Sequence, residues 1–178
     1  MNSKIEKKRS RRGWLWGTGS AVIAAALLIF FMRTTLYPYS VGPKQPLPFS
    51  HRIHAGVRQI SCLFCHDSAD RSPNAGMPAL EKCLLCHNVI AAKFDPIRKL
   101  HQYYDDKRPV RWVRVYQLPD YVHFTHEMHL AAGIDCSKCH GDVKGMDRIA
   151  AWEPIYMGFC IDCHRKNGAT VDCLYCHY

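Results

Sequence analysis

The ten cysteines of this chain form five C-x-x-C pairs, and a histidine directly follows every pair. Two thiols at this spacing can each bond to one vinyl group of a haem, while the adjacent imidazole reaches the iron from the same face. With 11 histidines among 178 residues, five such followers would arise by chance roughly once in a million sequences. The pattern therefore predicts five covalently attached c-type haems, each with its iron. The motifs are CLFCH at Cys62, CLLCH at Cys83, CSKCH at Cys136, CIDCH at Cys160 and CLYCH at Cys173.

The motifs define two kinds of site residue. The predicted proximal iron ligands are His66, His87, His140, His164 and His177. No phosphate-binding loop, nucleophile elbow or zinc-protease motif occurs in the sequence, so we predict no catalytic residue. Haem attachment is predicted at Cys62, Cys65, Cys83, Cys86, Cys136, Cys139, Cys160, Cys163, Cys173 and Cys176.

Zinc sites and disulfides are the other common uses of paired cysteines. Zinc ribbons do not require a histidine after every pair, and five pairs do not divide into four-cysteine sites. Ten cysteines outside the cytoplasm could instead form five disulfides. The five complete motifs favour haem over both alternatives.

Six histidines lie outside the motifs, enough to give every iron a second axial ligand. His51 with His54, and His126 with His129, form two H-x-x-H pairs at helical spacing. The two imidazoles of such a pair point to nearly the same side and can serve two closely packed haems. We expect these four histidines to be distal ligands. The fifth distal ligand stays open among His123, His101, Met157, Met146 and Met77.

An internal repeat organises the part of the chain that holds the motifs. The sequence FSHRIH at 49–54 precedes Cys62, and FTHEMH at 124–129 precedes Cys136. The two copies cover about 49–87 and 124–178, and the segment 88–120 between them has no cysteine. Short helices are expected near each cysteine pair. Within the haem-free insert 88–120, the spacing of apolar residues predicts a helix over 91–104 and an edge strand over 110–116.

The N-terminal segment has the features of a membrane anchor. Residues 13–32 carry no charge and are long enough to cross a hydrocarbon core as one helix. The basic residues before them place the N-terminus in the cytoplasm and the haem domain on the periplasmic or extracytoplasmic side. A cleaved signal peptide is the alternative, with small residues at 24–26, but the apolar run continues past them to Met32. The boundaries are 1–12 basic tail, 13–36 transmembrane anchor, 37–48 Pro-rich linker and 49–178 haem domain.

The net charge of +9 does not indicate a nucleic-acid partner. Seven of the 24 Lys and Arg residues lie at or before Arg33, beside the apolar segment. The remainder carries 17 basic and 14 acidic residues, without a basic stripe interleaved with aromatics. We therefore expect no nucleic-acid binding.

The sequence around the motifs resembles the pentahaem c-type cytochrome subunit of alternative complex III, a bacterial quinol-oxidising respiratory or photosynthetic assembly. The resemblance covers nearly the whole chain and is carried by PFSHRIHAG, ISCLFCH, SADRSPNAGMPALEKCLLCH, WVRVYQLPDYVHFTHEMH, GIDCSKCHGDVKGMDRI, MGFCIDCHR and DCLYCHY. It implies an electron-transfer subunit that is not itself an enzyme. The implied partners are polytopic quinol-binding subunits, an iron-sulfur protein that would dock on the insert 88–120, and a monohaem cytochrome or soluble electron acceptor.

The fold expected from these features is a single N-terminal transmembrane helix followed by a mostly α-helical and irregular multihaem cytochrome c domain of the class III or c7-like type. Its apolar residues are too few and too irregularly spaced to offset the ordering entropy, so haems should form most of the core. Two other functions remain as alternatives. One is a stand-alone quinol dehydrogenase cytochrome that feeds periplasmic reductases, and the other is a catalytic multihaem reductase with one iron open to substrate.

Overall fold

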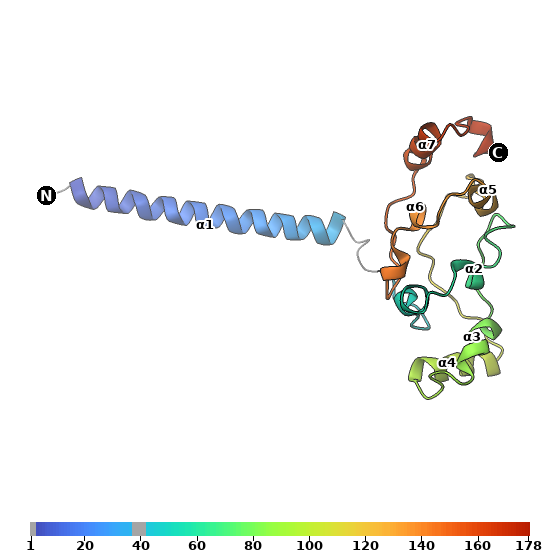
Figure 1. Ribbon diagram of the computed structural model, residues 1–178. Coiled ribbons are helices and arrows are strands. Elements are labelled where there is room, and N and C mark those ends of the chain that lie inside the picture. Colours follow the sequence, from blue (N-terminus) through green and yellow to red (C-terminus); the bar gives the residue numbers. More distant parts are fainter. Residues whose placement is uncertain (1–2, 37–41) are drawn as a thin grey trace. The chain divides into compact units, whose positions relative to one another are not determined.

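The computed structural model describes residues 3–36 and 42–178, with side chains described over 16–32 and 42–178. The chain forms two compact units, which are Met1–Ser40 and Val41–Tyr178. Figure 1 shows one long helix in the first unit and short helices joined by irregular segments in the second.

The first unit is built on α1 (Ser3–Leu36), which confirms that the predicted anchor segment is helical. Its side chains from Trp16 to Met32 are exposed. Within the part of the chain whose side chains the structure describes, no helix has both the length and the apolar character needed to span a membrane. The predicted basic tail and the side chains of 13–15 and 33–36 lie outside that part of the chain. The membrane anchor and its orientation therefore stay predictions.

The second unit consists of short helices and irregular chain, as expected, and the described residues contain no strand. The helices α2, α3, α6, α7 and η4 each lie within or overlap a C-x-x-C-H motif, which confirms the short helices predicted near the cysteine pairs. One helical turn places both thiols of a motif on the same face. The elements are η2 (Arg52–Val57), α2 (Cys62–Cys65), α3 (Leu80–His87), α4 (Asp95–Asp105), α5 (His126–Ala131), α6 (Ser137–His140), η3 (Val143–Gly145), α7 (Met157–Lys166) and η4 (Cys173–Tyr175).

Few side chains are buried in the second unit. Leu47, Leu84 and Leu100 form a small apolar cluster, each less than a tenth exposed. This cluster holds α3 against α4, and residues 42–48 of the segment predicted as a linker belong to the same unit. Many large apolar side chains elsewhere are exposed, including Leu85 and Leu174 inside two of the motifs. So little buried apolar surface cannot offset the ordering entropy of the domain, which is consistent with a core completed by haems.

The insert 88–120 contains α4 (Asp95–Asp105), which begins four residues after the start of the predicted helix 91–104 and ends one residue after its end. The helix begins only at Asp95, because Ala91 has a φ of +54°, which is not helical. Pro96 lies in the first turn, where a residue without an N–H costs the helix no hydrogen bond. The predicted edge strand over 110–116 is wrong. Val113 bonds through its main chain to the Gln45 side chain, with N–H···Oε1 at 2.8 Å and C=O···Nε2 at 2.9 Å, instead of to a neighbouring strand.

The two repeat copies hold each other through equivalent main-chain contacts. The Arg52 N–H donates to the Met146 carbonyl at 2.9 Å, and the Glu127 N–H donates to the Ser72 carbonyl at 3.3 Å. Arg52 and Glu127 occupy the same position in FSHRIH and FTHEMH, and Met146 and Ser72 each lie ten residues after the first cysteine of their copy. The segment with the H-x-x-H pair in each copy therefore docks on the loop after the first motif of the other copy.

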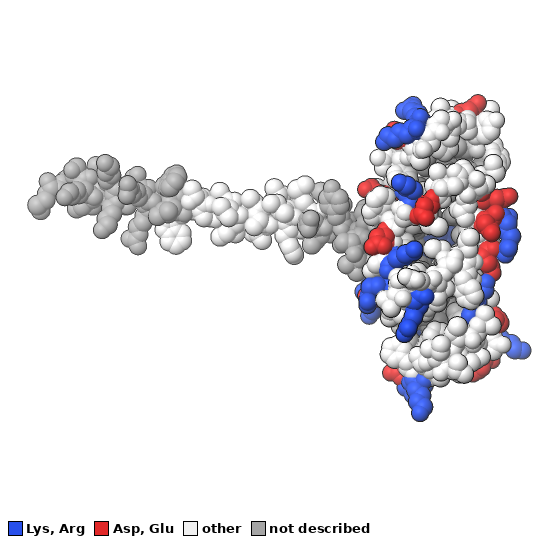
Figure 2. Space-filling model, viewed as in Figure 1, with Lys and Arg blue, Asp and Glu red and all other residues white. Residues whose placement is uncertain are grey.

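Charged side chains of both signs are interspersed over the face of the second unit that Figure 2 shows. Several charged side chains of this unit form exposed ion pairs, such as Arg108 with Asp106 at 2.8 Å. Exposed pairs of this kind contribute little to stability.

Candidate haem-binding sites

Most proximal histidines are held by a main-chain carbonyl at Nδ1. The Nδ1 atom donates to Gly76 O at 2.8 Å in His66, to Ile90 O at 3.0 Å in His87, to Thr170 O at 2.5 Å in His164 and to Tyr121 O at 3.1 Å in His177. A histidine that donates from Nδ1 keeps its Nε2 lone pair for a metal, and the carbonyl fixes the ring orientation. The φ of +75° at Gly76 belongs to the left-handed region, where glycine carries no Cβ penalty.

The predicted distal histidines have matching surroundings in the two copies. The ring of Phe49 lies 4.8 Å from that of His51 and 4.3 Å from that of His54, and Phe124 lies 4.8 Å and 4.6 Å from the rings of His126 and His129. The Nδ1 atom of His54 donates to the Ser50 carbonyl at 2.8 Å, and in the other copy the Nδ1 atom of His129 donates to the Thr125 carbonyl at the same distance. The repeat in sequence is thus a repeat in geometry.

Three distal rings face a proximal ring at a similar separation. The ring centres lie 6.0 Å apart for His54 and His87, 6.4 Å apart for His126 and His140, and 6.1 Å apart for His129 and His164. Two imidazoles that bind one metal from opposite sides through Nε2 have centres about 6 Å apart, since each metal–nitrogen bond is about 2 Å long. These pairs therefore fit one iron each.

His51 lies beside the remaining proximal histidine of the first copy. Burial, followed by the neighbouring His66 and His54, lowers the pKa of His51 to about 4. Its Nδ1 is buried without a hydrogen-bond partner. The pKa of His140 is likewise lowered, mainly by burial and to a smaller extent by its neighbours His126 and His66. The first and third motifs are therefore adjacent.

The thiols show the order in which the motifs follow one another in space. Burial raises the pKa of the Cys83 thiol, and Cys65 of the first motif raises it further. Three other thiols also have a raised pKa, with burial as the largest cause and a cysteine of a neighbouring motif as the next. These neighbours are Cys62 for Cys136, Cys163 for Cys139 and Cys176 for Cys160. Such effects fall off with distance. The motifs that begin at Cys83, Cys62, Cys136, Cys160 and Cys173 therefore form one continuous row, and α3, α2, α6 and α7 succeed one another in this order in Figure 1.

The candidates for the fifth distal ligand do not meet at one place. His101 donates from Nε2 to the carbonyl of His87 at 3.3 Å, beside the second motif and at the opposite end of the row from Cys173. His123 lies near the fifth motif, but its Nε2 donates to the carbonyl of Tyr178 at 2.5 Å and its ring stacks on that of Tyr178. Met157 and Met77 are more than half exposed, and Met146 is partly buried in the loop after the third motif. The fifth distal ligand remains a prediction among these five.

The cysteines are all free thiols, so the disulfide arrangement does not occur in this structure. Histidines meet in twos, and no group of three or more His, Cys, Asp or Glu side chains converges on one point among the described residues. A hollow of about 460 Å³ opens beside Cys62. Ligand pairs, free thiols and open space together fit the predicted haems.

Comparison with known proteins supports the same chemistry. Residues 122–178 match the family model described as cytochrome c7 and related cytochrome c. The chain is also 31% identical over 116 residues to the multihaem cytochrome c subunit of menaquinone reductase from Nitratidesulfovibrio vulgaris. That match covers 59% of this chain and 55% of the relative, so the chain spans about half the length of the protein it resembles.

Proposed function

We propose that this chain, a multihaem c-type cytochrome, is an electron-transfer subunit that relays electrons through a row of five haems in a quinone-linked membrane complex. The observation that carries the proposal is the continuous row of five motifs, with an imidazole facing the proximal histidine at about 6 Å in three of them. An unbroken row of low-spin haems suits electron transfer better than substrate binding.

The residues of the chain would supply attachment, ligation and orientation. Each haem, when bound, supplies an iron that accepts and returns one electron. The cysteine pairs fix each group to a short helix, and the main-chain carbonyls at Nδ1 hold His66, His87, His164 and His177 in position. Two axial imidazoles would close the iron to small molecules, which favours an electron carrier over the alternative of a catalytic reductase.

The link to quinone rests on two resemblances. The relative from Nitratidesulfovibrio vulgaris is a menaquinone reductase subunit, and the motif flanks resemble the pentahaem subunit of alternative complex III. We therefore propose that the chain belongs to a multisubunit quinone oxidoreductase and, more narrowly, to alternative complex III. Its partners would be a polytopic quinol-binding subunit, an iron-sulfur protein and a monohaem cytochrome, and the electrons would pass to a soluble acceptor. The helix over 13–36 would anchor it in the cytoplasmic membrane with the haem domain outside. The two resemblances imply opposite directions of electron flow, towards or away from quinone.

The decisive experiment is haem quantification and low-temperature EPR on the detergent-purified complex, with its subunits identified in the same sample. We expect five haems on this chain, at least four of them low-spin, together with an iron-sulfur protein and polytopic membrane subunits. A chain that purifies alone and shows a high-spin haem that binds substrate would instead support the catalytic reductase. Addition of menaquinol then decides the direction, since reduction of the haems supports quinol oxidation.

A further inference from the structure

The segment that presents His51 and His54 is a short turn with an uncommon backbone geometry. It forms η2, a π-helix of six residues, with His51 as its N-cap. π-helical turns are rare and occur frequently at functional sites. Contacts from outside the helix also hold this turn.

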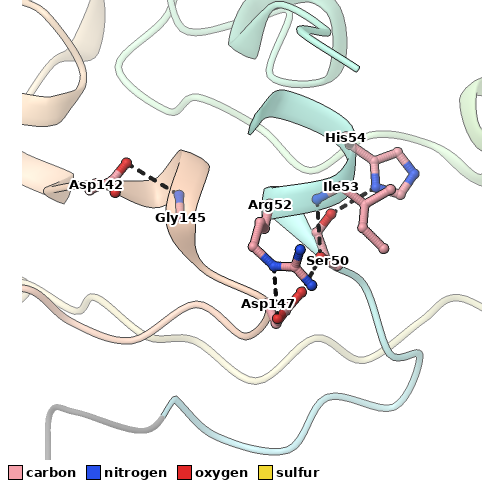
Figure 3. Close-up of polar contacts among 7 residues, drawn as sticks. All are labelled: Ser50, Arg52, Ile53, His54, Asp142, Gly145 and Asp147. Atoms are coloured by element: carbon pink, nitrogen blue, oxygen red, sulfur yellow. Dashed lines mark hydrogen bonds and ion pairs between the residues drawn. The ribbon is translucent and has the colours of Figure 1, made fainter. Parts of the chain in front are cut away.

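Those contacts come from the loop after the third motif, in the other repeat copy. Asp147 accepts hydrogen bonds from Ser50 Oγ at 2.6 Å and from Arg52 Nε at 3.0 Å (Figure 3). The same Ser50 receives the Ile53 N–H on its Oγ at 3.2 Å and the His54 Nδ1–H on its carbonyl at 2.8 Å. One intervening residue, Ser50, thus connects the carboxylate to the His54 ring.

The approach of η2 to this loop is close. A Cβ at Gly56 would lie 2.4 Å from the Lys144 carbonyl oxygen, so only glycine fits there. The loop itself is fixed by Asp142, which accepts the Gly145 N–H at 3.2 Å (Figure 3). Asp147 therefore stands at a fixed place against η2.

The equivalent contact in the other copy uses main chain. Pro73 lies eleven residues after Cys62, as Asp147 does after Cys136. The Pro73 carbonyl accepts from His126 Nδ1 at 2.8 Å and from the His126 N–H at 3.2 Å. In the first copy the Nδ1 of His51 has no such partner, and the Asp147 side chain holds the segment instead. Only the first copy can therefore lose this support through a side-chain substitution.

We propose that Asp147, through Ser50 and Arg52, is a positioning residue for the distal ligands His51 and His54, so that ligation of the first two haems depends on a residue from the second repeat copy. The inference rests on the proposed haem-binding function. Exposed ion pairs contribute little to global stability, and the Asp147 and Arg52 side chains are 60% and 50% exposed. Loss of the carboxylate should therefore loosen the two rings rather than unfold the domain.

The test uses the full-length chain with its haems, purified in detergent, reduced with dithionite and titrated with carbon monoxide. Carbon monoxide binds to an iron whose distal ligand is missing or easily displaced. Asp147→Ala should add up to two CO-binding haems per chain relative to the unmodified protein. Asp106→Ala, which removes an ion pair of similar exposure in the insert, is the matched control and should add none.

A double-mutant cycle assigns the effect to particular irons. In a His51→Ala/His54→Ala background the first two irons are already open, so Asp147→Ala should add nothing. In a His126→Ala/His129→Ala background it should add the same gain as in the unmodified chain. Asp147→Asn keeps one acceptor oxygen and should give a smaller gain, and it decides the question if the alanine variant yields no holoprotein.

Two results would overturn the inference. One is a CO stoichiometry no higher than that of Asp106→Ala while all attached haems are retained, and the other is a gain that persists in the His51→Ala/His54→Ala background. The proposed function fails separately, if the unmodified chain carries no row of low-spin haems by haem assay and EPR.

Discussion

At the scale of the residue, most of the predicted histidine ligands bond the main chain through the same ring nitrogen. Seven histidines donate from Nδ1 to a carbonyl and leave Nε2 available, whereas His101 and His123 donate from Nε2. A ring held at Nε2 must turn before it can bind an iron through that atom. The seven are His54, His66, His87, His126, His129, His164 and His177.

Replacement of a distal ligand should therefore differ sharply from replacement of an exposed neighbour on the same helix. In His129→Ala the iron paired with His164 loses its second imidazole, so one haem per chain should become high-spin in EPR with the haem count unchanged. Met128→Ala, the matched control at an exposed side chain on the same helix, should leave every spin state as it is. Equal spectra of the two variants would contradict the assignment of His129 as a ligand.

At the scale of the element, α3 and α4 are held together by the small cluster of Leu47, Leu84 and Leu100. Leu100 is only 4% exposed. Leu100→Ala should therefore lower the free energy of unfolding by about 2–4 kcal/mol, from lost burial and the cavity left behind. Val113→Ala, at a side chain 46% exposed, should cost less than about 0.5 kcal/mol. Chemical denaturation followed by far-UV circular dichroism measures both, and similar midpoints would show that the cluster does not hold the insert.

How much of these elements could be predicted depends on what fixes them. The helices at the motifs are predictable, because two thiols and an imidazole can meet one haem only from a helical turn. The irregular conformation of 110–116 was not predictable from its β-branched residues, since the partner of Val113 is the side chain of Gln45, far away in the sequence. The carbonyls that hold the rings carry no sequence signal. Likewise, the sequence repeat alone does not predict that each copy docks on the loop after the first motif of the other copy.

The insert also offers an exposed basic surface for the proposed docking of a partner subunit. Arg111 and Arg114 are exposed, whereas Tyr116 packs its ring 4.9 Å from that of His140 and should be left intact. Arg111→Glu/Arg114→Glu should reduce co-purification of partner subunits while all haems are retained. Arg165→Glu/Lys166→Glu on α7 is the control with the same charge change. Unchanged subunit composition in the first variant would place the docking surface elsewhere.

At the scale of the whole haem-binding unit, the row of motifs has a symmetric centre and one additional member. The motifs at Cys62 and Cys136 meet in the middle, and those at Cys83 and Cys160 lie outside them. The motif at Cys173 extends the row at one end only, beside Cys160. A haem at the end of a row has one neighbouring haem, whereas a central haem has two and lies between the repeat copies.

Loss of the terminal haem should consequently be tolerated and loss of a central haem should not. Deletion of 172–178 keeps the Thr170 carbonyl that holds His164 and should give a folded chain with four haems. Cys136→Ala/Cys139→Ala removes the haem on which both copies pack, so residues 122–178 should lose protection from hydrogen exchange and bind fewer than four haems, because haem attachment supplies the missing core. Haem quantification and hydrogen exchange on the two purified variants test this difference. A folded, fully protected four-haem protein from the cysteine variant would show that the central haem is not needed for the fold, and that the two copies pack together through protein contacts alone.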